Sequence, residues 1–387
     1  MSEKIQSKQI DVVSERPNKY LRRTYTLLLL LVISLFIWRI FCYKSPQEQL
    51  MEIEAFRAIP DSENAAIYYN KLITDSNNFA VFNELRSHAP PSYYLPWKSN
   101  SDPEGSAILR KNRLWIDKLI DTSKIKDARF SIYPEYIFGY GMEKYIREAS
   151  FILSWAGAND LGENRIDQAM DKFTSITRIS FHLYQQPVRT YNLSGTAIEA
   201  VGLRNIRDIT MCRDITKEQL MFLDTIVSQT KNYIDQNKEL EGKIERLLNA
   251  KQSTGLPFIT RIRKWYIDRY VRKAEEKRWQ EILHRRISTQ RAGRILIALR
   301  LFQIQNLRWP EPLNEIESSL PDKTFIDEMN NSYFVYKLTG DGFVLYSKGP
   351  DNIDNNHKTG SDDVIFWPTL QYQNITKKSE TDLNHSN

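Results

Sequence analysis

The sequence predicts a mainly α protein with an N-terminal transmembrane helix, a helical-bundle ectodomain and a small C-terminal α+β module. A single long apolar run, YTLLLLLVISLFIWRIFCY, covers residues 25–43 of an otherwise hydrophilic chain of 387 residues. Helical periodicity then continues from Ser106 to about Asn306, and alternating residues beyond it indicate a β-hairpin and one further strand. Because the chain is long enough for more than one buried core, we expect several parts rather than one domain.

These patterns divide the chain into six parts. They are a cytoplasmic basic leader (1–24), the transmembrane helix (25–43), juxtamembrane helices with a Pro-rich loop (44–105), the helical ectodomain (106–290), the α+β module (291–368) and a disordered tail (369–387).

The apolar run Tyr25–Tyr43 is long enough to span a bilayer. At ~1.5 Å per residue it extends about 28 Å, which nearly matches a hydrocarbon core of about 30 Å. Arg39 would cost roughly 2.5–3.5 kcal/mol at the centre of a span, but it lies near one end, where its side chain can reach the headgroups. The aliphatic and phenylalanine residues contribute on the order of −4 to −7 kcal/mol. We therefore expect this run to insert into the lipid bilayer.

The charged flanks of the run predict its orientation. Six Lys and Arg residues precede it, whereas Lys44 and Arg57 follow it among several glutamates. The positive-inside rule therefore places the N-terminus in the cytoplasm and the ectodomain outside. No small-x-small cleavage site follows the run, which favours an uncleaved anchor over a signal peptide. The only two cysteines, Cys42 and Cys212, exclude a disulfide framework and favour a single-pass protein of the bacterial cytoplasmic membrane.

The ectodomain pattern is helical. Lys44–Pro60 predicts a juxtamembrane helix, and a second helix is predicted to begin at Asp61 or Ser62. Thr74–Gly105 contains four prolines and predicts a long irregular loop. Apolar spacings then predict helices over Asp160–Tyr184, Val188–Met211 and Thr216–Tyr233. Short connections between them favour an antiparallel bundle or an irregular solenoid.

Positive charge is concentrated in Arg261–Arg308. Fourteen Lys and Arg residues there face four acidic residues, an excess of 14 − 4 = +10 against +6 for the whole chain. One interpretation is a patch that binds an anionic surface, either lipid headgroups or another polyanion. The alternative, which we favour on general grounds, is a solvated helix face. The outward orientation makes nucleic acid the least expected partner, and the sequence identifies no protein partner.

The C-terminal part changes in character from about Arg291. A helix with an apolar face is predicted to break at Trp309-Pro310, and a short second helix follows. The alternating runs SYFVYKL (332–338) and GFVLYSK (342–348) surround Thr339-Gly340-Asp341 and predict a β-hairpin. A polar loop then leads into a strand over Val364–Trp367.

These C-terminal residues resemble a known module. The helix–Pro–helix pattern, followed by GFVLYSKGPD and DDVI, is similar to the head of type II secretion pseudopilins of the major class. A near-identical module recurs in single-span envelope proteins of planctomycetes and verrucomicrobia, which the middle of this chain resembles only in its general helical style. Those proteins carry an N-A-A-x-x-Y element after the anchor, matched here by Asn64–Tyr69. The similarity covers mostly residues 291–367 and implies no activity. It also does not make the chain a pilin, because a long helical region separates anchor and head.

The resemblance implies a calcium site in the polar loop. In pseudopilin heads this loop binds Ca²⁺ through carboxylates and backbone carbonyls, the ligands that calcium prefers. His357 and Lys358 stand where the family prefers glycines, and the loop lacks the EF-hand pattern. The alternative is an Asx-rich turn satisfied by its own backbone. The candidate ligands are Asp351, Asp354, Asp362 and Asp363.

No pattern of enzyme chemistry stands out. No metal-binding histidine pair, nucleophile elbow or P-loop occurs, so no catalytic or cofactor-binding residue is assigned. We expect His182 to be a packed histidine rather than a base, and Trp97 to hold a loop against the core. The leading hypothesis is a non-enzymatic scaffold or interaction ectodomain. The alternative is a membrane-anchored hydrolase that would combine His182 with an acidic stripe expected on one helical face: Asp160, Glu163, Asp167 and Asp171.

Overall fold

The computed structural model describes residues 24–34, 44–88, 95–132, 141–229, 233–253, 258–340, 342–358 and 360–368. These residues form a mainly α protein with two small sheets near the C-terminal end, as the sequence predicts. Residues 24–34 are helical, and the rest of the predicted span lies outside the described residues. Among the helices described, none combines the length and hydropathy needed to cross a membrane. The basic leader up to residue 23 and the predicted disordered tail also lie outside the described part.

Two helices follow the predicted anchor. Helix α2 (Pro46–Arg57) begins at Ser45, whose hydroxyl accepts from the Glu48 amide while the Glu48 carboxylate accepts from the Ser45 amide. The next helix begins later than predicted. A 3-10 turn, η1 (Asp61–Glu63), precedes α3 (Ala65–Thr74), and Asn64 caps α3 by accepting from the Ala66 amide.

The predicted loop Thr74–Gly105 is wrong in its first half, because helix α4 (Ser76–His88) occupies it. Phe79, Phe82 and Leu85 recur every three residues, and Phe82 and Leu85 are fully buried. The prolines begin only at position 90, after this helix has ended. Helices α5 (Pro103–Lys111) and α6 (Arg113–Lys124) follow.

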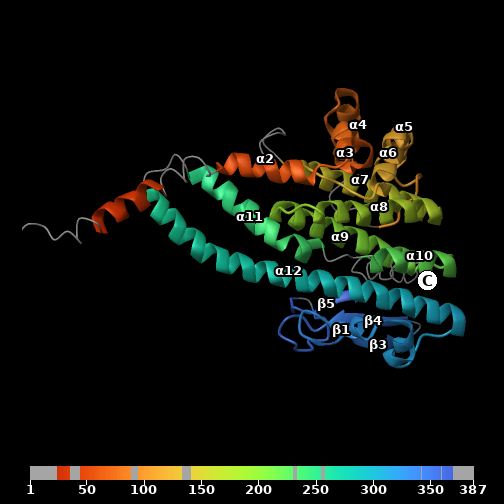
Figure 1. The fold of residues 1–387 in the computed structure, drawn as a ribbon. Coiled ribbons are helices and arrows are strands. Elements are labelled where there is room, and N and C mark those ends of the chain that lie inside the picture. The colour runs from red at the N-terminus through yellow and green to blue at the C-terminus, as the bar shows by residue number, and fades with distance from the viewer. Residues whose placement is uncertain are drawn as a thin grey trace, which may run out of the picture.

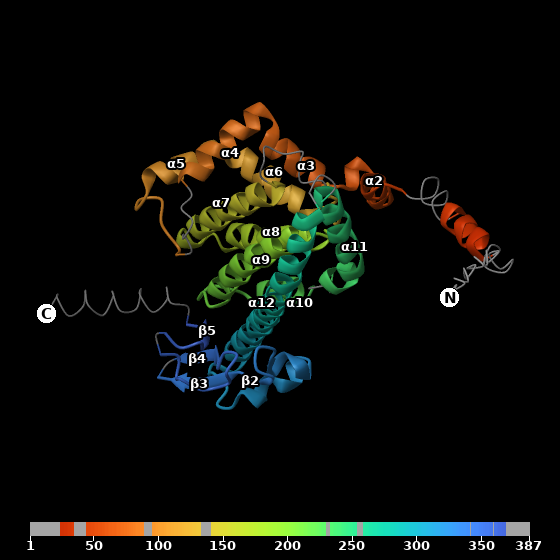
Figure 2. The same ribbon diagram turned by 90° about the vertical axis from the view of Figure 1, so that its left-hand side faces the viewer.

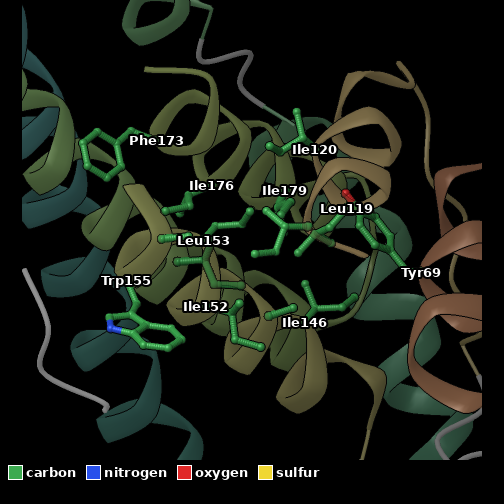
Figure 3. Packing of buried hydrophobic residues seen from close by; sticks show 14 of the residues in the cluster. Tyr69, Leu119, Ile120, Ile146, Ile152, Leu153, Trp155, Phe173, Ile176 and Ile179 are labelled. Atoms are coloured by element: carbon green, nitrogen blue, oxygen red, sulfur yellow. The ribbon is translucent and has the colours of Figure 1, made fainter. Parts of the chain in front are cut away.

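The centre of the molecule is an antiparallel bundle of α7 (Met142–Gly162), α8 (Ile166–Tyr184), α9 (Arg189–Thr210) and α10 (Lys217–Ser228). The predicted helices over 188–211 and 216–233 are thereby confirmed, with the second ending earlier. Figure 3 shows the interior, where Leu153, Ile176 and Ile179 pack together with aromatic residues at its edges. Helices α3 and α6 add Tyr69 and Leu119 to the same core.

The predicted helix Asp160–Tyr184 is confirmed from Ile166 onward, but a turn separates its first residues from the rest. Helix α7 ends at Gly162, α8 begins at Ile166, and Asn164 lies between them with a left-handed φ of 58°. Gly162 is required by close packing, since a Cβ there would lie 2.2 Å from the carbonyl oxygen of Trp97. The Trp97 ring stacks on Trp155, which confirms that Trp97 holds its segment against the core.

A long helical hairpin runs along the bundle. Helix α11 (Tyr233–Ser253) and α12 (Phe258–Asn306) are antiparallel, and α12 extends along the whole molecule (Figure 1). Leu50 and Ile53 of α2 pack with Ile244 of α11. Helix α12 crosses residue 291 without interruption, so the predicted boundary there falls inside a continuous helix.

The C-terminal module packs against the second half of α12, as both views show (Figures 1 and 2). After α12 come two 3-10 turns, η3 (Leu313–Ser319) and η4 (Asp322–Phe325). A three-stranded antiparallel sheet has the order β3 (Val335–Thr339), β4 (Gly342–Ser347), β5 (Val364–Trp367). The predicted hairpin and further strand are confirmed, and the predicted break near Trp309 follows the end of α12.

One detail of the predicted hairpin differs. Ser332 and Tyr333 form a separate strand, β2 (Ser332–Tyr333), which pairs with β1 (Ile326–Asp327). Phe334 causes the division, since its buried side chain contacts Phe366 in the core and interrupts the run before β3. Asp327 attaches this part to α12, because its fully buried carboxylate accepts from Ser288 Oγ at 2.5 Å and from the Ser347 hydroxyl.

Candidate functional site

The N-A-A-x-x-Y element, Asn64–Tyr69, joins the segment after the predicted anchor to the bundle. Asn64 Oδ1 accepts from the Arg129 amide at 2.8 Å, and Asn64 Nδ2 donates to the Arg129 carbonyl at 3.4 Å. Ala65 and Ala66 are buried in the main core. The matched residues therefore have structural roles: the asparagine pairs with an extended segment, and the alanines allow close packing.

His182, the histidine considered as a base, is buried beneath this element. Its Nε2 lies 2.6 Å from the Ile125 carbonyl and its Nδ1 lies 2.9 Å from the Tyr69 hydroxyl. The carbonyl can only accept, so Nε2 carries the proton and Nδ1 accepts from the tyrosine. Burial lowers the pKa of His182 to about 4 and raises the pKa of Tyr69 well above its usual value.

This geometry confirms His182 as a packed histidine. Nδ1 is hydrogen-bonded to a phenol and Nε2 to a peptide carbonyl. A catalytic histidine would instead be oriented by a carboxylate, and neither partner is one. The ring is 2 % exposed and sits in the core rather than at a cleft. The partnership of His182 with the acidic stripe, which the alternative hydrolase would need, is therefore not formed.

Two glutamines, which sequence reasoning missed, complete this junction. Gln185 accepts from the Ala128 amide at 2.8 Å, and Gln186 accepts from the Phe130 amide at 3.1 Å. Gln186 also accepts from Arg57 at the end of α2 at 2.6 Å. The signal in the sequence was weak, because the pair follows the last apolar residues of α8 and resembles an ordinary helix end.

The acidic stripe is dispersed by the turn between α7 and α8. Asp160 and Asp171 line one cleft, whereas Glu163 and Asp167 bond elsewhere, to the Ser99 amide and to Gln219. The prediction of four carboxylates on one helical face is therefore wrong. Its physical reason is that Gly162 to Arg165 reverse the chain, which leaves Asp160 on α7, Glu163 in the turn, and Asp167 and Asp171 on α8.

The cleft that Asp160 lines is bordered by further charged side chains, among them Arg110, Asp171 and Lys172. It encloses about 370 Å³ between α5, α6, α7 and α8. Asp160 accepts from Arg165 Nε at 2.8 Å and from Lys172 Nζ at 2.6 Å. Both oxygens of this half-enclosed carboxylate are thus bound by cations, which suits a structural ion pair and not a base that must take up a proton.

The four predicted calcium ligands lie in turns of the polar loop and do not converge. Asp351 accepts from the Ile353 amide at 2.9 Å, and Asp363 accepts from the His357 amide at 2.7 Å. Asp362 accepts from the Asp351 amide at 3.4 Å. In the part of the chain that the structure describes, no three His, Cys, Asp or Glu side chains gather as metal ligands. These contacts fit the Asx-rich turn, but Oδ1 of Asp363 is buried without a hydrogen-bond partner among the described residues, so the calcium site stays a prediction.

The fourth candidate, Asp354, belongs to a surface cluster. It accepts from the Tyr346 hydroxyl at 2.7 Å and from the Asn356 amide at 2.8 Å. Lys337 Nζ lies 2.6 Å from the same hydroxyl and 3.3 Å from the carboxylate. These hydrogen bonds, that to Tyr346 foremost, hold the pKa of Asp354 below its usual value. The ammonium occupies the place that a cation would need.

A buried ion pair connects α9 to α12. Glu199 is 1 % exposed and accepts from Arg286 Nε at 2.5 Å and from the Tyr184 hydroxyl at 2.7 Å. The Arg286 guanidinium also lies over the Tyr184 ring, 4.5 Å from its centre. Burial disfavours the charged guanidinium, but the Tyr184 and Glu199 contacts outweigh it and raise the pKa of Arg286. Sequence reasoning placed Arg286 only in a basic segment and missed its partner.

Arg286 is one of several basic residues of that segment with partners in the fold. Arg294 pairs with Asp224 at 2.9 Å, and Arg291 with Glu328 at 2.8 Å. Arg308 pairs with Glu315 at 2.7 Å. The second half of Arg261–Arg308 therefore holds the bundle and the C-terminal module together.

Comparison with known proteins adds no identity, because no family model, curated protein or solved structure matches this chain.

Proposed function

We propose that this chain is a single-pass protein of the bacterial cytoplasmic membrane, with its N-terminus inside. Its helical ectodomain acts outside the membrane as a non-enzymatic scaffold or interaction module. Residues 25–43 anchor the protein in the bilayer.

The main support for this membrane anchor is an apolar helix whose side chains are exposed. Within residues 24–34, Leu27 is 68 % exposed and Leu31 is 62 % exposed. Contiguous apolar surface in water costs about 25 cal/mol per Å², and large patches of it mark membrane or protein contacts. The basic leader before this helix supports the bilayer as its surroundings and the inward N-terminus.

The scaffold role is supported by the use that the fold makes of its buried polar groups. His182, Asp160 and Glu199 each have partners that fix neighbouring helices. A hydrolase would need such a group oriented toward a cavity and free to exchange a proton. Among the described residues, none of these three groups therefore supports the alternative hydrolase.

The long helix α12 supports a connecting function. Its 49 residues extend about 73 Å at ~1.5 Å per residue. The helix joins the end of the molecule near residues 24–34 to the pseudopilin-like module (Figure 1). A module held at a fixed distance from a membrane suits a protein that presents a binding surface to a partner.

The orientation is tested by fusing alkaline phosphatase after residue 60 in a bacterial host. We expect an active enzyme, because the fusion would be exported, and an inactive one after residue 23. The reverse pattern would overturn the proposed orientation. The scaffold role is tested by extracting the intact protein with detergent, where we expect a stoichiometric protein partner. A hydrolytic activity that Asp160→Asn abolishes would contradict it.

A further inference from the structure

We propose that the first part of α12, residues 258–272, is a second membrane contact that binds anionic phospholipid headgroups of the outer leaflet. We call these residues the basic end of α12. The inference rests on the proposed anchoring through residues 25–43.

The packing of α2 on α11 brings the helical hairpin of α11 and α12 close to the proposed membrane surface. Helix α2 begins at Pro46, three residues after the predicted span ends at Tyr43. At no more than about 3.6 Å per residue, its first turn lies within roughly 10 Å of the end of the span. Leu50, in the next turn, packs with Ile244 of α11. The hairpin is therefore held against the part of the ectodomain that leaves the bilayer.

The directions of α11 and α12 place the basic end of α12 on the side of the molecule where the proposed anchor lies. Helix α11 ends at Ser253 and α12 begins at Phe258, so the hairpin closes beyond the contact with α2. In Figure 1 the beginning of α12 and the helix of residues 24–34 lie at the same end of the molecule, opposite the C-terminal sheet. An anchored protein would thus present the basic end of α12 to the membrane surface.

The sequence of this part suits an anionic interface. It contains five basic residues and one acidic residue, Asp268, for an excess of 5 − 1 = +4. Each basic residue near an anionic membrane surface strengthens binding by about fivefold. Tyrosine and tryptophan rings prefer the headgroup level of a bilayer. The aromatic residues of the basic end are Phe258, Trp265, Tyr266 and Tyr270.

The basic segment beyond residue 272 has contacts within the fold. Arg286, Arg291 and Arg294 form ion pairs with Glu199, Glu328 and Asp224, so they serve the interior contacts of α12. We therefore place the anionic-surface contact at the end of α12 that lies nearest the anchor, and not along the whole segment. A lipid surface is the occupant that this position favours over any soluble polyanion.

The test uses the full chain in lipid nanodiscs that contain a doxyl-labelled quencher lipid. Cys42 and Cys212 are replaced by serine, and the fluorophore NBD is attached to one new cysteine at a time. Thr260→Cys reports the basic end, Leu30→Cys reports the anchor, and Leu338→Cys reports the exposed strand β3 of the C-terminal module. The nanodiscs contain phosphatidylcholine alone or an equal mixture with phosphatidylglycerol.

We expect quenching at position 260 only with phosphatidylglycerol, and its loss in about 1 M salt, where the Debye length falls to about 3 Å. Position 30 should be quenched in both lipids and position 338 in neither. Replacing Arg261, Arg263 and Lys264 by glutamine should lower the ratio of docked to undocked hairpin on the order of 100-fold. The matched control replaces three exposed basic residues of α6 by glutamine and should leave the quenching unchanged: Arg113, Lys118 and Lys124.

Each contrary result has one meaning. Quenching at position 30 without quenching at position 260 in phosphatidylglycerol would overturn this inference and leave the anchor intact. Absence of quenching at position 30 would overturn the anchor itself. Equal, salt-insensitive quenching at position 260 in both lipids would show an apolar contact and contradict headgroup binding. Unchanged melting of the glutamine variant confirms that its loss of quenching does not come from unfolding.

Discussion

The Tyr69 hydroxyl donates to Nδ1 of His182 across 2.9 Å, and this bond joins α3 to α8 inside the main core. Tyr69 closes the N-A-A-x-x-Y element that follows the predicted anchor, and Asn64 opens it with its bonds to Arg129. The element therefore fixes the segment after the predicted anchor to the bundle.

Tyr69→Phe should destabilise the protein by about 1–3 kcal/mol, because it leaves the buried Nδ1 of His182 without its donor. The measurement is urea unfolding of the detergent-solubilised chain. Tyr68→Phe is the matched control on the same helix, and it should change the free energy of unfolding by less than about 0.5 kcal/mol. Equal effects of the two substitutions would show that the hydrogen bond contributes nothing particular.

His182 also predicts a dependence of stability on pH. Burial lowers its pKa to about 4 in the folded state, below an unfolded value near 6.5. The unfolded chain therefore binds more protons between these values, and stability is lost as the pH falls from about 6.5 to 4, by on the order of 3 kcal/mol. Removing the ring with His182→Gln should flatten this part of the profile. A variant whose profile parallels that of the unmutated protein would contradict the prediction.

Glu199→Gln should destabilise the protein by about 3–5 kcal/mol, because it leaves the buried Arg286 without its counter-charge. Replacing both residues by methionine should cost much less than the single change. The control is Asp117→Asn, which breaks the exposed Arg113–Asp117 pair of α6 and should cost about 0.5 kcal/mol or less. Thermal unfolding followed by circular dichroism compares the four proteins, and a mild effect of Glu199→Gln would refute a role for the pair in holding α12.

Asp354→Ala should destabilise the C-terminal module whether or not calcium is added. The substitution removes the acceptor of Tyr346, Asn356 and Lys337, a loss of about 1–3 kcal/mol. Calcium should leave the melting temperature of the unmutated chain unchanged, because Asp351, Asp354 and Asp363 each accept a hydrogen bond from a backbone amide of the loop. A calcium-dependent rise that Asp351→Ala abolishes would restore the site that the resemblance implies.

The order of helices and the C-terminal hairpin could be predicted because their signals are local. The period of apolar residues predicts α9 and α10, and the alternation on either side of Gly340 predicts β3 and β4. Prolines misled the prediction at α4, where Phe82 and Leu85 form a helix before the first proline. The turn at Asn164 was likewise not predicted, because the helical spacing of apolar residues continues both before and after it.

The polar contacts of the interior could not be predicted, since they join residues far apart in the chain. His182 meets Tyr69 and Glu199 meets Arg286 only after the helices have packed. A single sequence shows each of these as an isolated polar residue on a helix. Its charge pattern also did not show which arginines of α12 pair with carboxylates of other helices.

The central claim is that residues 25–43 cross the membrane and leave the helical ectodomain outside. The direct measurement is labelling of intact cells with a membrane-impermeant maleimide, after Cys42 and Cys212 have been replaced by serine. A cysteine at Leu114, which is 78 % exposed on α6, should be labelled in intact cells. A cysteine at Ser7 in the leader should be labelled only after permeabilisation. Labelling of Ser7→Cys in intact cells, with Leu114→Cys protected, would contradict the account.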